Sequence, residues 1–269
     1  MQKKPIKAKI ITIKETLFLK SINLAKSNQS KTGLMILFDI LFLASFFGLQ
    51  TLSQYFAKSV VLPTALSSAA FLLVSFSLVY YLLILLAYSF FKYFVLDFTK
   101  SLFGKSEFSF SRLGQFYSLN IIIAGIFFAV MFLFNIILAS IKSNYAPFVF
   151  IVMATPYLLF LYVITNTAHS LFYQGASMKN TLKESFIMAF TKMKVYRETI
   201  LIMILFALVL WLVFLGGGYL LRLLASKNYS LYLNAYAYFR QASVIVFDAV
   251  FYFTILINRI SFYSIINEN

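Results

Sequence analysis

The sequence predicts an all-α protein: a polytopic membrane helical bundle of six spans, with amphipathic interfacial helices on the cytoplasmic side. Hydrophobic residues make up 62% of the 269 residues and charged residues 12%, with a mean hydropathy of +0.88. Ordinary soluble chains carry about 25% charged residues. The apolar residues also fall in six runs, each long enough for a helix to cross about 30 Å of hydrocarbon. Such a chain cannot build the polar shell of a soluble domain.

A basic segment, residues 1–33, precedes the membrane domain of residues 34–269. Ile10, Ile13 and Leu17 recur at helical spacing among lysines, and Leu24 shares their face. This pattern is typical of a helix that lies in the headgroup plane. The first apolar run follows a long lysine-rich lead and is too long for a signal peptide, so we expect it to remain as a span.

The six spans are expected to form three hairpins with short outer turns. The second run is longer than a bilayer requires, so we expect that span to tilt or to continue beyond the inner surface. The expected spans are residues 34–56, 65–96, 116–141, 148–172, 199–224 and 239–266.

The segments between the hairpins are expected to be amphipathic. In residues 180–198 apolar side chains recur at helical spacing among lysines, and residues 97–117 show a weaker form of the pattern. Residues 219–240 follow three consecutive glycines, and we interpret them as an interfacial or re-entrant outer segment. An ordinary belt of interfacial aromatic residues explains the tyrosines of that segment equally well.

Lysine and arginine residues are distributed unequally between the two sides of the predicted spans. Eight precede the first span, four lie at or beyond the inner end of the second, and five follow the fourth, which gives seventeen on one side and five on the other. The excess of positive charge predicts that both termini are cytoplasmic, in what we expect to be a prokaryotic plasma membrane. Because these residues flank apolar runs, they favour the lipid bilayer and its anionic headgroups as partners over nucleic acid. A protein partner at the inner interfacial helices stays open.

Several polar residues lie inside the predicted spans, where a lone ionisable group is costly. The direction of each span places five of them in one inner-leaflet layer. We expect Asp39 and Arg259 to form a helix-locking pair, since each is otherwise an isolated buried charge. His169 is more typical of a hydrogen-bonded or headgroup-level residue than of a ligand. The five residues are Asp39, Asn120, Asn166, His169 and Arg259.

Asp248 is a separate candidate, because it falls near the expected midplane of the last span. No basic residue is predicted at its depth. A structural role and a cation-binding role fit it equally well, since midplane carboxylates bind coupling ions in transporters.

No catalytic, cofactor-binding or metal-binding residues are predicted. The chain contains no glycine-rich phosphate loop, no G-x-S-x-G and no H-E-x-x-H sequence. With one histidine and no cysteine, a zinc site with three or four protein ligands is not expected.

The run from Asn180 to Trp211 is an amphipathic, lysine-rich helix that leads directly into a Phe- and Leu-rich span. This unit resembles one that recurs in uncharacterised prokaryotic six-span membrane families. It is similar in layout to the membrane domain of glycerophosphodiester phosphodiesterases. The resemblance implies an all-helical integral membrane fold and brings no catalytic residues, because the phosphodiesterase domain itself is missing.

Two functions therefore compete. A non-enzymatic protein that organises lipids or scaffolds partner proteins predicts dry packing between spans and a paired Asp39. A transporter, or the permease subunit of an ATP-driven pump, predicts a continuous polar cavity that reaches Asp248. A lipid-modifying enzyme is disfavoured, because it needs an inner-surface carboxylate cluster that the sequence does not supply.

Overall fold

The computed structural model describes residues 16–59, 66–106, 108–224 and 229–267, and within these ranges the regular structure is entirely helical. Six of the helices (α2, α3, α4, α5, α7 and α8) are long and apolar enough to cross a membrane. The all-α, six-span prediction is therefore confirmed. The helices are α1 (Leu17–Ser27), α2 (Gln29–Ser59), α3 (Leu66–Ser101), α4 (Phe110–Ala139), α5 (Ala146–Gln174), α6 (Met178–Thr191), α7 (Met193–Leu224) and α8 (Tyr229–Asn267).

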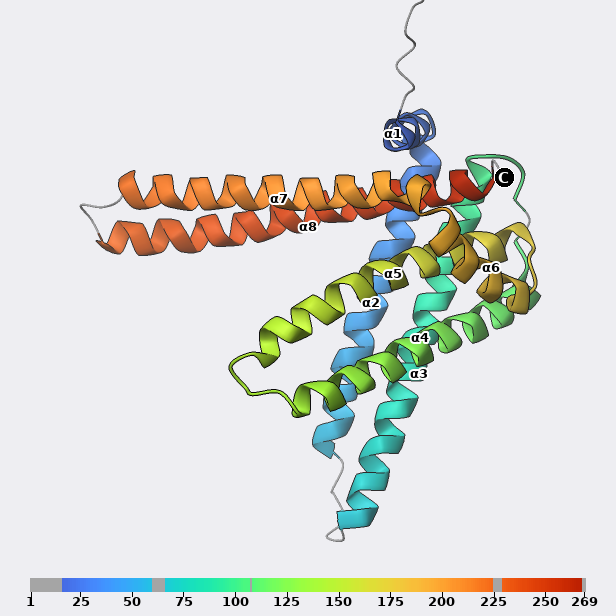
Figure 1. The fold of residues 1–269 in the computed structure, drawn as a ribbon, viewed down its shortest axis with the longest axis horizontal. Coiled ribbons are helices and arrows are strands. Elements are labelled where there is room, and N and C mark those ends of the chain that lie inside the picture. The colour runs from blue at the N-terminus through green and yellow to red at the C-terminus, as the bar shows by residue number, and fades with distance from the viewer. Residues whose placement is uncertain (1–15, 60–65, 107, 225–228, 268–269) are drawn as a thin grey trace, which may run out of the picture.

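The six long helices form three hairpins, α2/α3, α4/α5 and α7/α8, which spread like a fan (Figure 1). They converge at one end, which we call the hub. The hub comprises α1, α6, the first parts of α2, α4 and α7, and the last parts of α3, α5 and α8. Both ends of the described chain lie there, as an even number of spans requires.

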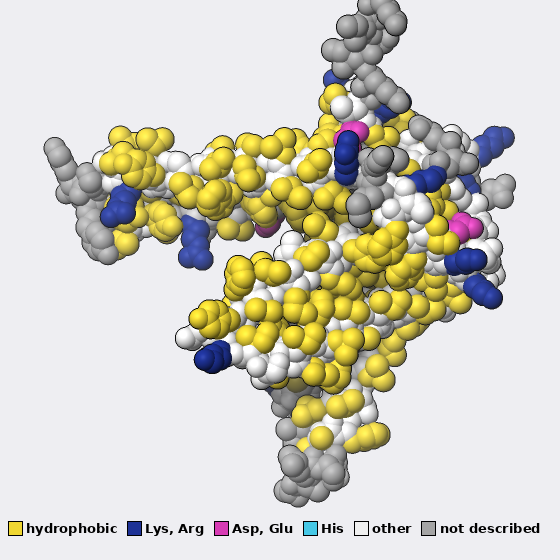
Figure 2. Space-filling model, viewed as in Figure 1, with side chains coloured by type: hydrophobic (Ala, Val, Ile, Leu, Met, Phe, Trp, Pro, Cys, Tyr) yellow, Lys and Arg dark blue, Asp and Glu magenta, His cyan; other side chains and the backbone are white. Residues whose placement is uncertain are grey.

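The buried core lies mainly in the hub, with Ala154 of α5 as a buried residue farther out. In α3 the buried residues lie between Ser89 and Thr99, and in α8 they lie between Thr254 and Ile266. Over the most apolar stretch of each span, 28% of the residues or fewer are buried. The outer parts of the hairpins therefore carry hydrophobic side chains on their surface (Figure 2).

The length of the spans makes this fan compatible with a bilayer. The spanning helices contain 29 to 39 residues, or about 44 to 58 Å at 1.5 Å per residue. The hydrocarbon core is only about 30 Å thick, so strongly tilted hairpins still reach across it. The overlong second span is α3, which continues to Ser101.

The two amphipathic helices predicted most clearly are present, and both pack onto the hub. The side chain of Thr16 caps α1, and Ser177 caps α6. The buried face of α6 consists of small residues, Thr181, Ser185 and Ala189, whereas the aromatic ring of Phe190 is mostly exposed. For the N-terminal helix, Ile10 and Ile13 lie outside the described residues.

The weaker amphipathic helix predicted at 97–117 is wrong. Helix α3 runs on to Ser101, and α4 already begins at Phe110. Two of the aromatic residues that suggested an interfacial helix pack into the hub instead: Phe116 is fully buried, and the ring of Phe108 stacks on Phe94 at 4.6 Å between centroids. Phe110 is mostly exposed.

The interfacial or re-entrant segment predicted at 219–240 is also wrong for the described residues. Helix α7 continues through the three glycines to Leu224, and α8 begins at Tyr229. The glycines serve helix packing rather than a break, because a Cβ on Gly217 would lie 2.9 Å from the ring of Phe239. Glycine thus lets α7 approach α8 closely at this point.

Candidate functional site

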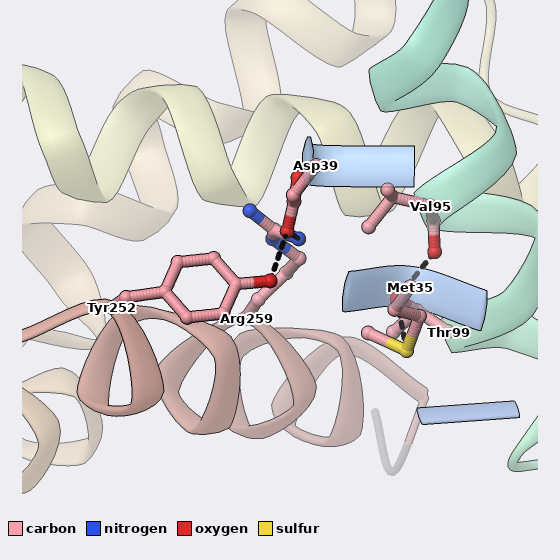
Figure 3. A network of polar contacts seen from close by, with 6 residues as sticks. All are labelled: Met35, Asp39, Val95, Thr99, Tyr252 and Arg259. Atoms are coloured by element: carbon pink, nitrogen blue, oxygen red, sulfur yellow. Dashed lines mark hydrogen bonds and ion pairs between the residues drawn. The ribbon is translucent and has the colours of Figure 1, made fainter. Parts of the chain in front are cut away.

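Helices α2 and α8, the first and last spans, are joined by an ion pair in the hub (Figure 3). Arg259 Nη1 donates to Asp39 Oδ2 at 2.9 Å, and the Tyr252 hydroxyl donates to the same oxygen at 2.9 Å. Tyr252 and Arg259 are seven residues apart, or two helical turns, so they project from one face of α8. The pairing predicted from span direction is thus present.

One turn before Asp39, Met35 packs α2 against α3. Its sulfur lies 4.0 Å from the hydroxyl of Thr99, which itself donates to the carbonyl of Val95 at 2.8 Å (Figure 3). Met35, Thr99 and Val95 are fully buried. This dry contact holds α2 in the register that directs Asp39 toward α8.

A chain of hydrogen bonds joins α3, α4 and α5 within the hub, where the ring of His169 lies 6.3 Å from that of Tyr88. Asn120 Nδ2 donates to Ser89 Oγ at 2.9 Å, and Asn120 Oδ1 lies 2.7 Å from His169 Nε2. All three side chains are buried. His169 is therefore a hydrogen-bonded interior residue, and Asn120 is its partner, which the sequence did not indicate.

Asn166 does not join this layer. Its side-chain amide donates to the carbonyl of Tyr162, one turn earlier in α5, at 2.8 Å. A polar side chain that bonds to its own helix satisfies itself without linking two spans.

Asp248 lies apart from every other candidate. Its side chain is exposed on α8, and it makes no ion pair with any residue of the described ranges. A groove of about 640 Å³ on α8 extends from Leu233 to Ile245 and ends before Asp248. The role of Asp248 stays a prediction.

Lys92 is the residue that sequence reasoning placed wrongly. It was counted among the lysines at the inner surface, whereas only 9% of it is exposed, and it lies within electrostatic reach of both Arg259 and Asp39. Its position within an aromatic run was the available signal, because Phe91 precedes it and Tyr93 follows it. A lysine so placed cannot extend to the surface without leaving the helix packing.

Further polar contacts fasten the remaining helices to the hub. Ser261 Oγ of α8 donates to Ser21 Oγ of α1 at 2.8 Å. Arg112 of α4 donates to the carbonyl of Phe172 at 2.6 Å, near the C-terminus of α5. The carboxylate of Asp97 accepts from Tyr173 and Ser106. These contacts explain why the hub is the ordered core of the molecule.

Both hydrogen bonds that the Asp39 side chain accepts end on the same carboxylate oxygen, so α8 fixes the orientation of this carboxylate through two donors. Among the residues that the structure describes, no three of His, Asp or Glu are grouped to hold a metal ion.

The fold and the site define a multi-pass helical membrane protein with a polar hub at one end. Comparison of the chain with models of protein families, with curated proteins and with solved structures gives no match. The resemblance in layout to known membrane families therefore stays a prediction.

Proposed function

We propose that this chain is a non-enzymatic, lipid-organising protein of a prokaryotic plasma membrane, with its hub at the cytoplasmic face. The observation that carries the proposal is the fan of three hairpins, which pack together at the hub and expose apolar side chains elsewhere. Surfaces of this kind contact acyl chains, because no other apolar phase is available in the bilayer. Lipid therefore occupies the space between the hairpins.

The charge of the hub supports its cytoplasmic placement. Exposed lysines lie on both amphipathic helices, for example Lys20 and Lys26 on α1 and Lys183 on α6. Lysines in such positions attract the anionic headgroups of the inner leaflet, at about 1 kcal/mol for each residue near the surface.

The orientation is testable on the native background, because the chain contains no cysteine. Lys58→Cys places a thiol at the outer end of α2, and Lys179→Cys places one on α6. We expect a membrane-impermeant maleimide to label Lys58→Cys on intact cells and Lys179→Cys only after lysis. Labelling of Lys179→Cys on intact cells would reverse the proposed orientation.

The lipid-organising function is testable with spin-labelled lipids in reconstituted vesicles. A fan exposes more apolar surface than a compact bundle of equal helix count. We therefore expect more motionally restricted lipid for each chain than for a compact six-helix membrane protein measured in parallel. An equal or smaller restricted fraction would refute the proposal.

The second candidate is the permease subunit of an ATP-driven pump, and the exposed basic face of α6 favours it. Lys179 and Lys183 are exposed there, at the end where a cytoplasmic ATPase would bind. The test is ATP-dependent solute flux into reconstituted vesicles. If the native chain supports such flux and Lys183→Glu abolishes it, the permease function is favoured over the lipid-organising function.

A further inference from the structure

The hub buries two basic side chains within electrostatic reach of one carboxylate. Lys92 is 9% exposed and Arg259 is 8% exposed. Among the described ranges, Asp39 is the acidic residue that is bonded to Arg259, and it lies within electrostatic reach of Lys92. Across residues 16–59, 66–106, 108–224 and 229–267, Lys92 has neither a hydrogen bond nor an ion pair. With both bases protonated, this cluster carries one positive charge in excess.

A further donor beside the ion pair also lacks a partner. The Nε of Arg259 is buried without a hydrogen bond in the described part of the chain. The side chain of Tyr88, one turn before Lys92 on α3, lies within electrostatic reach of Arg259 and Asp39. Lys92, Arg259 and Tyr88 therefore supply N–H and O–H donors to one region. A buried donor without a hydrogen bond destabilises the folded state, so a ligand that supplies an acceptor is favoured here.

The depth of this region suits a headgroup phosphate. Lys92 precedes the end of α3 by nine residues and Arg259 precedes the end of α8 by eight, or about 12–14 Å of helix. Helices α3 and α8 contain 36 and 39 residues, so their ends extend beyond a hydrocarbon core of about 30 Å, and residues at this distance from the ends lie near the boundary between hydrocarbon and headgroups. The cluster is also not sealed, because 18% of the Asp39 side chain is exposed.

We propose that Lys92 and Arg259, with the hydroxyl of Tyr88, bind the phosphate group of an anionic ligand in the hub. A phosphodiester carries one negative charge, which cancels the excess charge of the cluster. Its oxygens accept the hydrogen bonds that the buried donors lack, and charge-assisted bonds of this type are the stronger ones. The phosphate belongs either to an anionic phospholipid or to a soluble phosphate compound. The lipid source rests on the proposed lipid-organising function and deepens it.

The test is thermal unfolding of the full chain, delipidated in a neutral detergent. The probes are phosphatidylglycerol, phosphatidylcholine and inorganic phosphate, each added alone. We expect phosphatidylglycerol, at about a hundredfold excess over its Kd, to raise Tm by roughly 5–11 °C. Phosphatidylcholine, whose choline group would face Lys92, should raise it less.

Lys92→Met and Lys58→Met form the matched pair of variants. Lys92→Met replaces an uncompensated buried charge with an apolar side chain, so the ligand-free protein should melt at the same temperature or higher. The same variant should lose most of the phosphatidylglycerol shift, with affinity lower by about tenfold or more. Lys58 is exposed at the outer end of α2, away from the hub, and Lys58→Met should keep the shift. A merely structural lysine at position 92 would instead lower the ligand-free Tm when it is replaced.

The outcomes separate the two sources and the two proposals. A shift with phosphatidylglycerol alone, abolished by Lys92→Met, assigns a lipid phosphate. An equal shift with inorganic phosphate, abolished by the same variant, keeps the phosphate site but assigns a soluble ligand. No shift with either probe, or a full shift in Lys92→Met, overturns the site. The fraction of motionally restricted lipid in vesicles depends on the apolar surface of the fan and not on the phosphate site. If the phosphate proposal is wrong and the lipid-organising proposal is right, this fraction is still high.

Discussion

Charge counting in the hub makes a quantitative prediction about Asp39 and Arg259. With Lys92 and Arg259 protonated, the native cluster has a net charge of +1. Asp39→Leu raises this charge to +2, whereas Arg259→Met lowers it to zero and leaves Lys92 within electrostatic reach of Asp39. Asp39→Leu combined with Arg259→Met returns the charge to +1. The two single variants should therefore differ strongly, although they break the same ion pair.

The magnitude follows from burial and from the two bonds of Asp39. Removing one partner of a buried pair costs about 3–5 kcal/mol. Since 18% of the Asp39 side chain is exposed, we expect about 3 kcal/mol for Asp39→Leu, at the low end of that range. For a chain of this size that corresponds to a Tm lower by roughly 6–12 °C. Arg259→Met should cost about 1 kcal/mol, because Tyr252 still donates to Asp39.

The assay is thermal unfolding of all four proteins in a neutral detergent without anionic lipid. The double variant should recover about 2 kcal/mol relative to Asp39→Leu, since a buried ion pair replaced on both sides by apolar residues is often tolerated. If the two single costs add to within about 0.5 kcal/mol in the double variant, the pair does not interact energetically. If Arg259→Met is the more damaging single change, the excess positive charge is not real.

Three further predictions concern other parts of the fold. Asn120→Leu should lower stability by about 1–3 kcal/mol, because it leaves buried groups on Ser89 and His169 without their partner; Asn166→Leu, whose native bond stays within its own helix, is the control in the same melting experiment. Gly217→Val should cost about 1–3 kcal/mol by driving a side chain into the ring of Phe239, whereas a Cβ on Gly216 meets no atom within 4 Å; equal melting temperatures for Gly217→Val and Gly216→Val would contradict the close approach of α7 and α8. Asp248→Leu should favour insertion of α8 by about 3 kcal/mol in a translocon insertion assay, and unchanged insertion would mean that Asp248 does not face lipid.

Periodicity and charge predicted the spans well, because both are local properties of the sequence. Each expected span coincides with a helix, although α2 begins at Gln29 and α8 at Tyr229, earlier than the apolar runs do. Hydropathy marks the part of a helix that fits the bilayer. It does not predict how far a helix continues beyond the bilayer, as α8 does over its first residues, Tyr229–Phe239. The three glycines of α7 led to the wrong prediction of an interfacial segment after them. A glycine in such a sequence can indicate either a helix break or a close helix contact, and the two are distinguished only by the position of the neighbouring helix.

The ion pair of the candidate site was predictable because its two residues could be matched by their depth in the membrane alone. Asp39 and Arg259 lie at similar depths in helices that point toward one end, and opposite charges there have few alternatives. The bond between Asn120 and His169 needed the rotation of α4 against α5, which hydropathy does not specify. Lys92 was missed because a lysine near the end of a span normally extends to the surface, and only the packing of α2 and α8 over it closes that route.

The pair between Asp39 and Arg259 also sets the order in which the protein can mature. Its partners are 220 residues apart in the chain, and they belong to the first and last spans. During synthesis the carboxylate of Asp39 enters the bilayer long before the guanidinium that neutralises it exists. Every nascent form that contains α3 but lacks α8 therefore has Lys92 within electrostatic reach of the Asp39 carboxylate and neither of its hydrogen-bond donors, Tyr252 and Arg259.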